Sequence, residues 1–212
     1  METLKDFVPF NTLEREPKEA LEKITRLKHY KKNEMICYEE DKCEEVYFLL
    51  QGEVRLYKVN RFGGEVVLGL LNQGLLVDYK GEAEPMAFAN LECKEESLVA
   101  CFKVSSLFEL MRIYPQIMAL FLNESLKKLS MFEKLIKQEL IFDSTAKIAY
   151  FLHCNLFEFN RQKKNENASF LNIQPETLSR ILKKLHREGI ITTNQDGKIE
   201  ILDDEKLRAI YE

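Results

Sequence analysis

From residue 29 onward, the spacing of apolar residues in this 212-residue chain changes character once, near Val104. Before that residue, short segments alternate apolar and polar side chains, and turn residues such as Gln51-Gly52 and Phe62-Gly63-Gly64 separate them. This pattern is typical of strands in an antiparallel sandwich or barrel. After Val104 the apolar residues recur every three or four positions, as on one face of a helix. The sequence therefore predicts an α+β protein with a β-rich first half and a helical second half.

The β-rich half is predicted to follow a first helix at residues 16–28. Ala20, Leu21, Ile24 and Leu27 form the apolar stripe of that helix. The strands predicted within residues 29–104 are 35–38, 46–50, 54–59, 65–70 and 98–102. Five or more short strands at near-regular spacing favour an antiparallel β-sandwich or jelly roll.

A long helix is predicted from Pro115 to about Leu140. Leu122, Leu129 and Ile136 are seven residues apart, which is close to the repeat of a coiled-coil seam. A packed core helix would explain the same stripe, but few other elements remain to cover so long a helix. We therefore expect dimerisation through it. The predicted dimerisation residues are Met118, Leu122, Leu126, Leu129, Phe132 and Ile136.

The last 70 residues resemble a winged helix-turn-helix. A helix at residues 143–160 and a short helix ending at residues 171–173 precede a third helix, which begins with Pro175 and ends before Gly189. Asp196-Gly197 then marks the turn of a β-hairpin. A short terminal helix is predicted at residues 203–211.

The helix that begins at Pro175 carries a polar face. Glu176, Ser179, Arg180 and Lys183 share it, because they lie at positions i, i+3, i+4 and i+7. Arginine pairs bidentately with guanine, and glutamate accepts from cytosine, so Glu176, Ser179 and Arg180 are the candidate base-reading residues. Seven basic residues against two acids lie between positions 161 and 187, as binding to phosphates requires. A solvated helix face is the alternative. The candidate phosphate or flanking contacts are Lys163, Lys164, Gln174, Thr177, Lys183 and Lys184.

Composition limits the remaining possibilities. The net charge of −4 argues against a protein that coats nucleic acid indiscriminately. The five cysteines are odd in number and form no CxxC pair, which indicates free thiols in a reducing compartment. No run approaches the ~20 apolar residues of a membrane span, and the N-terminus does not resemble a signal peptide. We expect a cytoplasmic protein without a membrane partner.

The chain resembles the Crp/Fnr family of bacterial transcription regulators along nearly its whole length. Residues 32–41 look like the opening strands of that family, residues 46–57 match its strand–glycine–strand segment, and residues 175–180 match its reading helix. The resemblance implies a homodimer that binds palindromic double-stranded DNA, with RNA polymerase as a further partner. It also implies three parts: a cyclic-nucleotide-binding-like β-roll effector domain at residues 1–114, a dimerisation helix at 115–141 and a winged DNA-binding domain at 142–212.

The reading helix is similar to the Fnr branch of the family, because Ser179 stands where the Crp branch has glycine. That similarity implies that Arg180 pairs with guanine, Glu176 meets cytosine and Ser179 approaches thymine, in a half-site like TTGAT. Two departures accompany the match. Pro175 replaces a basic contact residue of some relatives, and Asn167 replaces a residue that is usually apolar.

The effector region departs from cyclic AMP binders. Relatives hold the phosphate with an arginine, whereas residues 74–89 contain none, and residues 72–102 carry six acids and two lysines. The sequence therefore predicts a signal other than cyclic AMP, with Lys80 as the one substitute clamp. The candidate effector pocket, which ordinary core packing would equally explain, is Leu75, Leu76, Val77, Met86 and Phe88.

Redox and haem signals stay open. Cys37, Cys43, Cys93 and Cys101 are able to converge in space, but residues 1–36 lack the cysteine cluster of iron–sulfur relatives, so we expect no iron–sulfur centre and predict no metal site. A thiol switch, nitric oxide or haem are the alternatives for the signal. His29, a thiolate or Met86 would be the axial ligand of a haem; His153 and His186 are expected to be structural or to lie near phosphate.

Three classes of function make different demands on the sequence. No catalytic triad, metal-ligand pair, P-loop or dinucleotide fingerprint is present in the sequence, so we expect no enzyme. A sequence-specific transcription regulator explains both the basic patch and the polar face of the reading helix. The alternative is a ligand-binding protein whose winged domain contacts other proteins rather than DNA.

Overall fold

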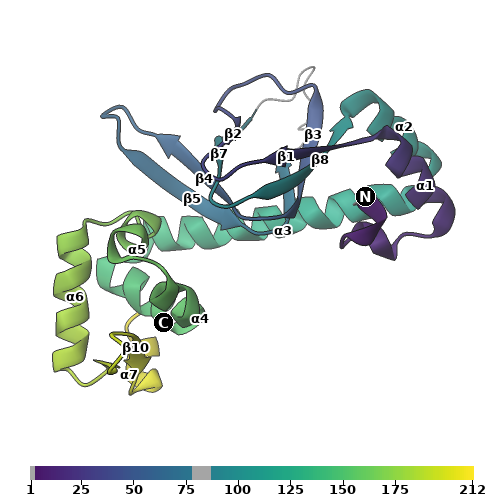
Figure 1. Cartoon of the computed structure of the whole chain (residues 1–212). Helices are drawn as coiled ribbons and strands as arrows, with labels where there is room; N and C mark the ends of the chain where they lie inside the picture. The colour runs from purple at the N-terminus through teal and green to yellow at the C-terminus, as the bar shows by residue number, and fades with distance from the viewer. Residues whose placement is uncertain (1–2, 78–86) are drawn as a thin grey trace. The chain divides into compact units, whose positions relative to one another are not determined.

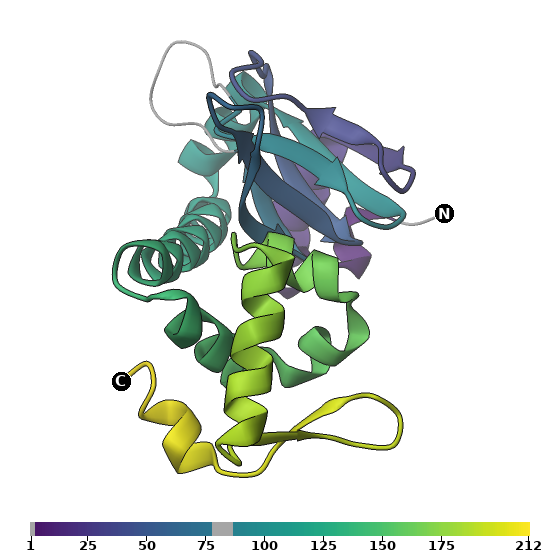
Figure 2. The same cartoon turned by 90° about the vertical axis from the view of Figure 1, so that its left-hand side faces the viewer.

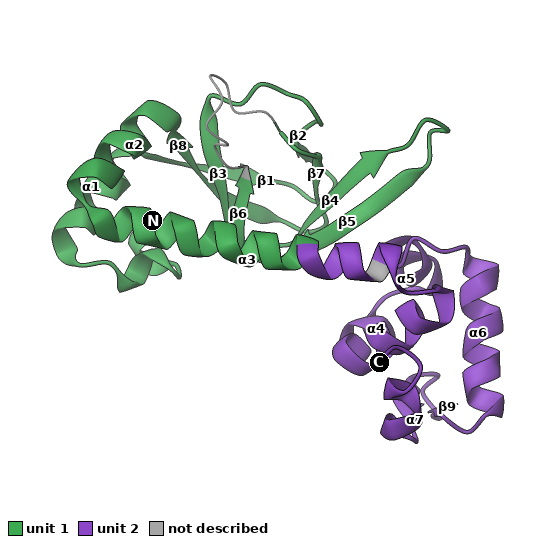
Figure 3. Cartoon of the chain, turned by 180° about the vertical axis from the view of Figure 1, so that it is seen from behind, with its two compact units in different colours: residues 1–132 green, residues 133–212 purple. Residues whose placement is uncertain are grey.

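The computed structural model of the chain describes residues 3–77 and 87–212. It divides into two compact units, residues 1–132 and 133–212, and the boundary falls inside one long helix (Figure 3). Each unit has a hydrophobic core of its own. The α+β fold class predicted from the sequence is confirmed.

The first unit contains two antiparallel four-stranded sheets and the helices that cover one of them (Figure 1). Its elements are η1 (Leu4–Asp6), η2 (Phe10–Thr12), α1 (Arg15–Ile24), β1 (Thr25–Tyr30), β2 (Met35–Cys37), β3 (Glu45–Gln51), β4 (Val54–Val59), β5 (Glu65–Leu71), β6 (Gly74–Val77), β7 (Asn90–Cys93), β8 (Ser97–Lys103), α2 (Val104–Ile113) and most of α3 (Pro115–Leu140). The strand orders are β1-β8-β3-β6 and β2-β7-β4-β5.

Two cores lie on the two faces of the first sheet. Phe48 of β3 and Phe102 of β8 face the helices, where they pack with Phe10 and Phe121. The neighbouring residues Leu49 and Cys101 face the second sheet instead, because side chains alternate along a strand. Burial on both faces explains why β8 forms a nearly continuous apolar run.

The first helix is shorter than the sequence predicts. Helix α1 ends at Ile24, and Leu27 lies in β1, so the prediction of helix to residue 28 is wrong there. Thr25 turns the backbone into the extended region, and β1 then pairs with β8 from Thr25 opposite Phe102 to Tyr30 opposite Ser97. Pairing with a central strand outweighs the helical spacing of Leu27.

The other predicted strands match β2, β3, β4, β5 and β8 to within a residue or so. Strands β6 and β7 are additional. Each has four residues and adds a strand to one sheet. Strand β6 pairs with β3 at the edge of the first sheet, and β7 lies between β2 and β4 in the second.

The second unit contains the end of α3 and a helical domain with a hairpin (Figures 1 and 2). Its further elements are α4 (Ser144–Arg161), α5 (Lys164–Phe170), α6 (Pro175–Arg187), β9 (Ile191–Thr193), β10 (Ile199–Ile201) and α7 (Asp204–Arg208). Asp143 caps α4, because its carboxylate accepts from the backbone N–H groups of Thr145 and Ala146 at 2.8 Å each. The hairpin turns at Gly197, whose φ of 77° suits glycine.

Candidate nucleic-acid interface

A buried leucine stripe fixes α6 against the rest of the second unit. Leu178, Ile181 and Leu185 enter the core together with Ala168 of α5 and Leu152 of α4. Because these residues occupy one side of α6, the opposite side faces outward. The sequence prediction of this amphipathic helix is confirmed.

The turn between α5 and α6 sets the angle at which α6 leaves. Asn172 adopts a φ of 53°, in the left-handed region that asparagine tolerates. The N–H of Ile173 donates to the carbonyl of Ala168 at 3.0 Å, which closes the end of α5. Pro175 then occupies the first turn of α6, where its missing N–H costs nothing.

Asn167 of α5 is buried in the turn region. Its Nδ2 donates to the carbonyl of Phe159 at 2.8 Å, while its Oδ1 has no hydrogen-bond partner among the described residues. Helix α5 therefore forms with an amide where an apolar residue would pack. One satisfied hydrogen bond offsets part of the cost of burying that amide.

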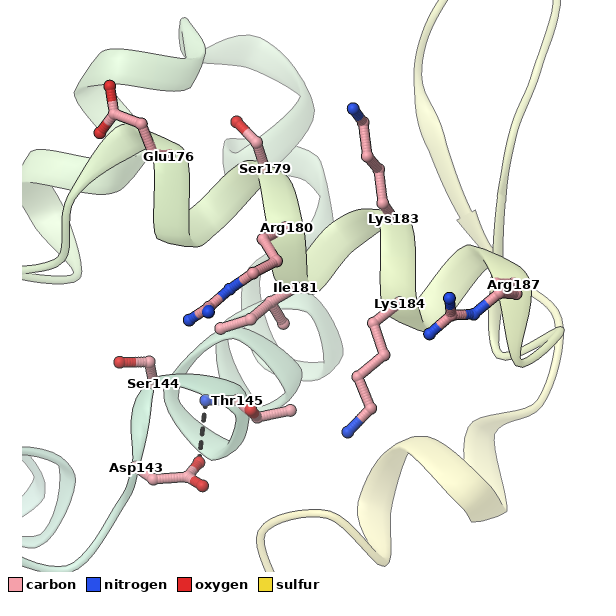
Figure 4. A pocket seen from close by; sticks show the side chains of 10 residues that line it. All are labelled: Asp143, Ser144, Thr145, Glu176, Ser179, Arg180, Ile181, Lys183, Lys184 and Arg187. Atoms are coloured by element: carbon pink, nitrogen blue, oxygen red, sulfur yellow. Dashed lines mark hydrogen bonds between the residues drawn. The ribbon is translucent and has the colours of Figure 1, made fainter.

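The three predicted base-reading side chains lie on the outward side of α6 (Figure 4). Glu176 and Arg180 are exposed, and Ser179 is half-buried. The Ser179 hydroxyl donates to the carbonyl of Pro175 at 2.7 Å, so its proton is bound within the helix and its lone pairs remain available. None of the three is covered by another part of the second unit.

An open groove of about 930 Å³ runs between α6 and the start of α4. Its lining residues are Asp143, Ser144, Thr145, Glu176, Ser179, Arg180, Ile181, Lys183, Lys184 and Arg187. Figure 4 shows two rows on α6: Glu176, Ser179 and Lys183 point to one side, whereas Arg180, Lys184 and Arg187 point toward α4. Helix α6 therefore presents a mixed row and a wholly cationic row.

Five residues that line this groove were not among the predicted contacts: Asp143, Ser144, Thr145, Ile181 and Arg187. Ser144 and Thr145 come from α4, which is distant in the sequence, so spacing along α6 could not indicate them. Arg187 was detectable, because Arg180, Lys184 and Arg187 lie at i, i+4 and i+7.

The cations of the groove have no charged or hydrogen-bonding partner among the residues that the structure describes. Within the described part of the chain, neither Arg180 nor Lys183, Lys184 or Arg187 forms an ion pair or a side-chain hydrogen bond. By contrast, Arg161 at the end of α4 pairs with Glu158 at 2.9 Å. A positive surface without internal neutralisation is suited to a polyanion.

The flanking residues surround the same face. Lys163, Lys164 and Gln174 are exposed, and Thr177 is half-buried. The backbone N–H of Lys163 donates to the Glu166 carboxylate at 2.8 Å, so this contact caps α5 and leaves the lysine ammonium outside it.

Helix α3 presents a second exposed surface. Met118, Leu122, Leu126, Leu129 and Ile136 are each at least half exposed. These residues lie on one stripe of the helix, with Phe132 at its edge. We name this stripe the α3 apolar face. Exposed apolar patches of this kind are a common feature of protein–protein interaction sites.

The opposite side of α3 packs against the sandwich of the first unit. Ile117 and Phe121 enter the core, and two charged residues that the sequence analysis missed, Glu124 and Lys128, are also buried. The Lys128 ammonium donates to the carbonyl of Leu76 in β6 at 2.8 Å. Glu124 lies beside Gly74, whose φ of 120° is a backbone conformation that residues with side chains rarely adopt.

The residues of the predicted effector pocket are spread over several environments. Leu75 faces the helices and Leu76 faces the second sheet, so these two side chains are not brought together. Val77 pairs through its backbone with Tyr47. Phe88 is partly exposed and makes an edge contact with Phe132, with ring centroids 5.2 Å apart. Met86 and Lys80 lie outside the described residues.

The candidate metal and haem ligands are distributed as follows. His29 is exposed on β1, His186 is exposed on α6, and His153 contacts the Tyr211 hydroxyl and approaches Asp204 at 3.6 Å. Cys37, Cys43, Cys93 and Cys101 are buried in the core between the two sheets, and Cys154 is exposed. No group of three or more His, Cys, Asp or Glu side chains in the described ranges is arranged to hold a metal ion.

No helix in the described ranges is both long and apolar enough to cross a membrane.

Fold and site together define a class of protein: a helix-turn-helix DNA-binding protein with an N-terminal ligand-binding type of β-roll. Residues 27–114 match the model of the cyclic nucleotide-binding domain, and residues 159–210 match that of the Crp-like helix-turn-helix domain. The chain belongs to the Crp/Fnr family of transcription regulators, which bind DNA and are not enzymes.

Solved structures share the fold. FixK2 from Bradyrhizobium japonicum is 22% identical with a TM-score of 0.67, and the match covers 89% of this chain and 98% of FixK2. A CooA variant from Carboxydothermus hydrogenoformans is 17% identical with a TM-score of 0.72, covering 99% and 95%. A Crp/Fnr-family regulator from Eubacterium rectale is 20% identical with a TM-score of 0.66, covering 96% and 97%. Among curated proteins, no sequence matches this chain.

Proposed function

We propose that this regulator acts as a homodimer that reads a TTGAT-like palindrome through α6. One observation carries the proposal: Glu176, Ser179 and Arg180 all lie on the solvent side of a helix whose inner side is fixed by Leu178, Ile181 and Leu185, and Arg180 turns toward the groove. A guanidinium and a carboxylate held on one rigid helix match guanine and cytosine edges in a major groove.

The cationic row supplies the affinity that does not depend on sequence. Lys184 and Arg187 follow Arg180 along the groove side of α6. Lys163 and Lys164 lie at the start of α5. Each phosphate that such a cation neutralises releases counterions, so the binding constant falls as salt rises.

The α3 apolar face supports the homodimer. Leu122, Leu129 and Ile136 are spaced for a helix pair, and all three are at least half exposed in the single chain. A second copy paired along this face would give the two α6 helices the two-fold relation that a palindrome has. RNA polymerase is the further partner that we propose from family membership.

The signal that we propose is not cyclic AMP. Residues 74–89 offer no arginine to a cyclic phosphodiester, and the surrounding stretch is acidic. The residues present therefore do not fit that ligand. Haem and nitric oxide stay as alternatives to a thiol signal.

The test is a fluorescence anisotropy titration of the full-length protein with three duplexes: two inverted TTGAT half-sites, one half-site, and a scrambled sequence. Specific reading predicts that the palindrome binds at least about 10³-fold more tightly than the scrambled duplex. Log affinity should fall linearly with log salt concentration.

The same titration distinguishes the alternative function. If the winged domain contacts proteins rather than DNA, all three duplexes bind weakly and without preference. Equal affinity for the palindrome and the scrambled duplex would therefore reject the proposed function.

A further inference from the structure

Two cysteines meet where strand β2 ends. Cys37 is the last residue of β2, and the chain then reverses in a tight turn before Cys43. The Asp41 N–H donates to the Tyr38 carbonyl at 3.1 Å, and the Asp41 carboxylate accepts from the Tyr38 N–H at 2.7 Å. Glu40 takes a φ of 66° within this turn. The reversal brings both cysteines into the core between the sheets.

The two cysteines lie in the same core cluster, where the interaction between their thiols shifts the pKa of each, and both side chains are buried, with exposures of 7% for Cys37 and 4% for Cys43. The Cys43 sulfur also lies 3.5 Å from the Asp41 carbonyl oxygen, to which the thiol donates. Cys37 and Cys43 therefore lie at the two ends of one short turn, which the hydrogen bonds between Tyr38 and Asp41 close.

The surroundings distinguish the two sulfurs. The hydrogen bond from Cys37 and, to a smaller extent, the backbone N–H of Ala87 lower the pKa of Cys43. The contact with Cys43 and burial raise the pKa of Cys37. Cys43 is thus the sulfur that forms a thiolate first, and thiolates are the nucleophilic form of cysteine.

The other cysteines lack these features. Burial raises the pKa of Cys93, and burial raises the pKa of Cys101 to about 11. Cys154 is exposed on α4 in the second unit. The Cys37–Cys43 pair is therefore chemically distinct within this chain.

The pair also lies near the anchor of α3. The pKa of Cys37, raised chiefly by the interaction with Cys43 and by burial, is lowered slightly by the positive charge of Lys128, and the same ammonium donates to the Leu76 carbonyl at 2.8 Å. A chemical change at the pair would alter the surroundings of a buried contact between α3 and β6. Helix α3 carries the apolar face that we propose for dimerisation.

We propose that Cys37 and Cys43 form a dithiol site that a small hydroperoxide oxidises to an intramolecular disulfide, and that this change lowers DNA affinity. The regulatory part rests on the proposed function. The Cys43 thiolate attacks one peroxide oxygen, the O–O bond breaks, and protonation of the leaving oxygen yields water and a sulfenic acid. The Cys37 sulfur then attacks the Cys43 sulfur, and hydroxide leaves as water with the Cys37 proton. Two thiols and one hydrogen peroxide give one disulfide and two waters.

The experiment treats the reduced full-length protein with equimolar hydrogen peroxide and follows it by intact-mass and peptide mass spectrometry. The expected product is 2 Da lighter in wild type and in Cys154→Ser, with a peptide link between Cys37 and Cys43. In Cys37→Ser the product is expected to stop at an oxidised Cys43 that is 16 Da or more heavier. Cys43→Ser should react at least about tenfold more slowly.

Each outcome decides one part. A disulfide link to Cys154 or Cys93 would overturn the dithiol site. The site would also be overturned if the wild-type mass did not fall by 2 Da and Cys43→Ser reacted as fast as wild type. The DNA arm compares reduced and oxidised wild type on the palindrome. An affinity at least about threefold lower after oxidation, reversed by dithiothreitol and absent in Cys43→Ser, is the expected result. Unchanged affinity overturns the regulatory part, whereas a reduced protein that ignores the palindrome would overturn the proposed function instead.

Discussion

Charged side chains are used in opposite ways in the two units. In the first unit, Arg55 is held by Glu65 at 2.9 Å and Glu92 at 2.8 Å, and Lys128 is held by the Leu76 carbonyl. On α6, Arg180 and Lys184 form no such contact within the described residues. A cation that is satisfied internally helps to specify the fold, whereas a cation left unsatisfied on a rigid element is available to a ligand.

This difference explains why DNA binding can be inferred from the residues of α6, whereas the signal cannot be inferred from those of the sandwich. The outward charged side chains of α6 form no ion pair within the described residues, because the inner stripe fixes the helix, so their chemistry indicates the kind of binding partner. In the sandwich, charged groups such as those of Arg55 and Lys128 are bound by other residues of the same unit. Their residue types therefore do not identify the signal molecule.

Leu129→Asp in the α3 apolar face should convert the dimer to a monomer. Pairing would bury two carboxylates without partners, which costs about 3–5 kcal/mol. Sedimentation velocity should show the monomer, and palindrome affinity should fall at least about 100-fold. Val59→Asp, an equally exposed apolar residue of β4, is the control and should remain dimeric. A dimeric Leu129→Asp would contradict the proposed interface.

Arg180→Ala should remove specific reading while the protein stays folded and dimeric. The loss of one bidentate contact costs about 1–3 kcal/mol in each half-site. Anisotropy should show the palindrome approaching the affinity of the scrambled duplex. Arg112→Ala, at an exposed arginine of α2 in the first unit, is the control. If the Arg180 variant kept wild-type preference for the palindrome, the assignment of α6 would fail.

Lys128→Met should destabilise the first unit. Under reducing conditions the variant should still bind the palindrome specifically through α6. The buried Leu76 carbonyl loses its donor, which costs about 1–3 kcal/mol of unfolding free energy. Urea unfolding measures that loss. Lys134→Met is the matched control, because Lys134 lies on the same helix and its side chain is exposed. Equal stability of the two variants would show that the buried contact does not hold α3.

Lys184→Ala should weaken palindrome and scrambled duplex by the same factor, since a phosphate contact carries no sequence information. The slope of log affinity against log salt should fall by about one for each phosphate that is no longer neutralised. Lys206→Ala, which removes a lysine paired with Asp203 at 2.9 Å, should leave the slope unchanged. A change of base preference in Lys184→Ala would place that residue in base reading instead.

The sequence predicted much of the fold because the decisive patterns were local. Alternation defined β3, β4, β5 and β8, and caps defined α4 and α6. The prediction failed where pairing between strands determines the secondary structure. Thr25–Tyr30 continues a helical pattern but pairs with β8, and Gly74–Val77 is too short to show a periodic pattern. Tertiary hydrogen bonds to a neighbouring strand are not encoded in spacing.

The candidate sites show the same limit. Glu176, Ser179 and Arg180 could be predicted because helical spacing places them together, whereas Ser144 and Thr145 come from another helix. A lysine in a helix normally reads as solvated, so the burial of Lys128 could not be seen. Cys37 and Cys43 meet only because the turn at Asp41 reverses the chain.

The most direct test of the central claim changes the distance between the two half-sites. Two α6 helices related by a two-fold axis read sites about one helical turn, or about 10 base pairs, apart. We predict that about five added base pairs, a half turn, lower the affinity of the full-length protein to that of a single half-site. Equal affinity for the original and the lengthened palindrome would contradict paired reading by α6.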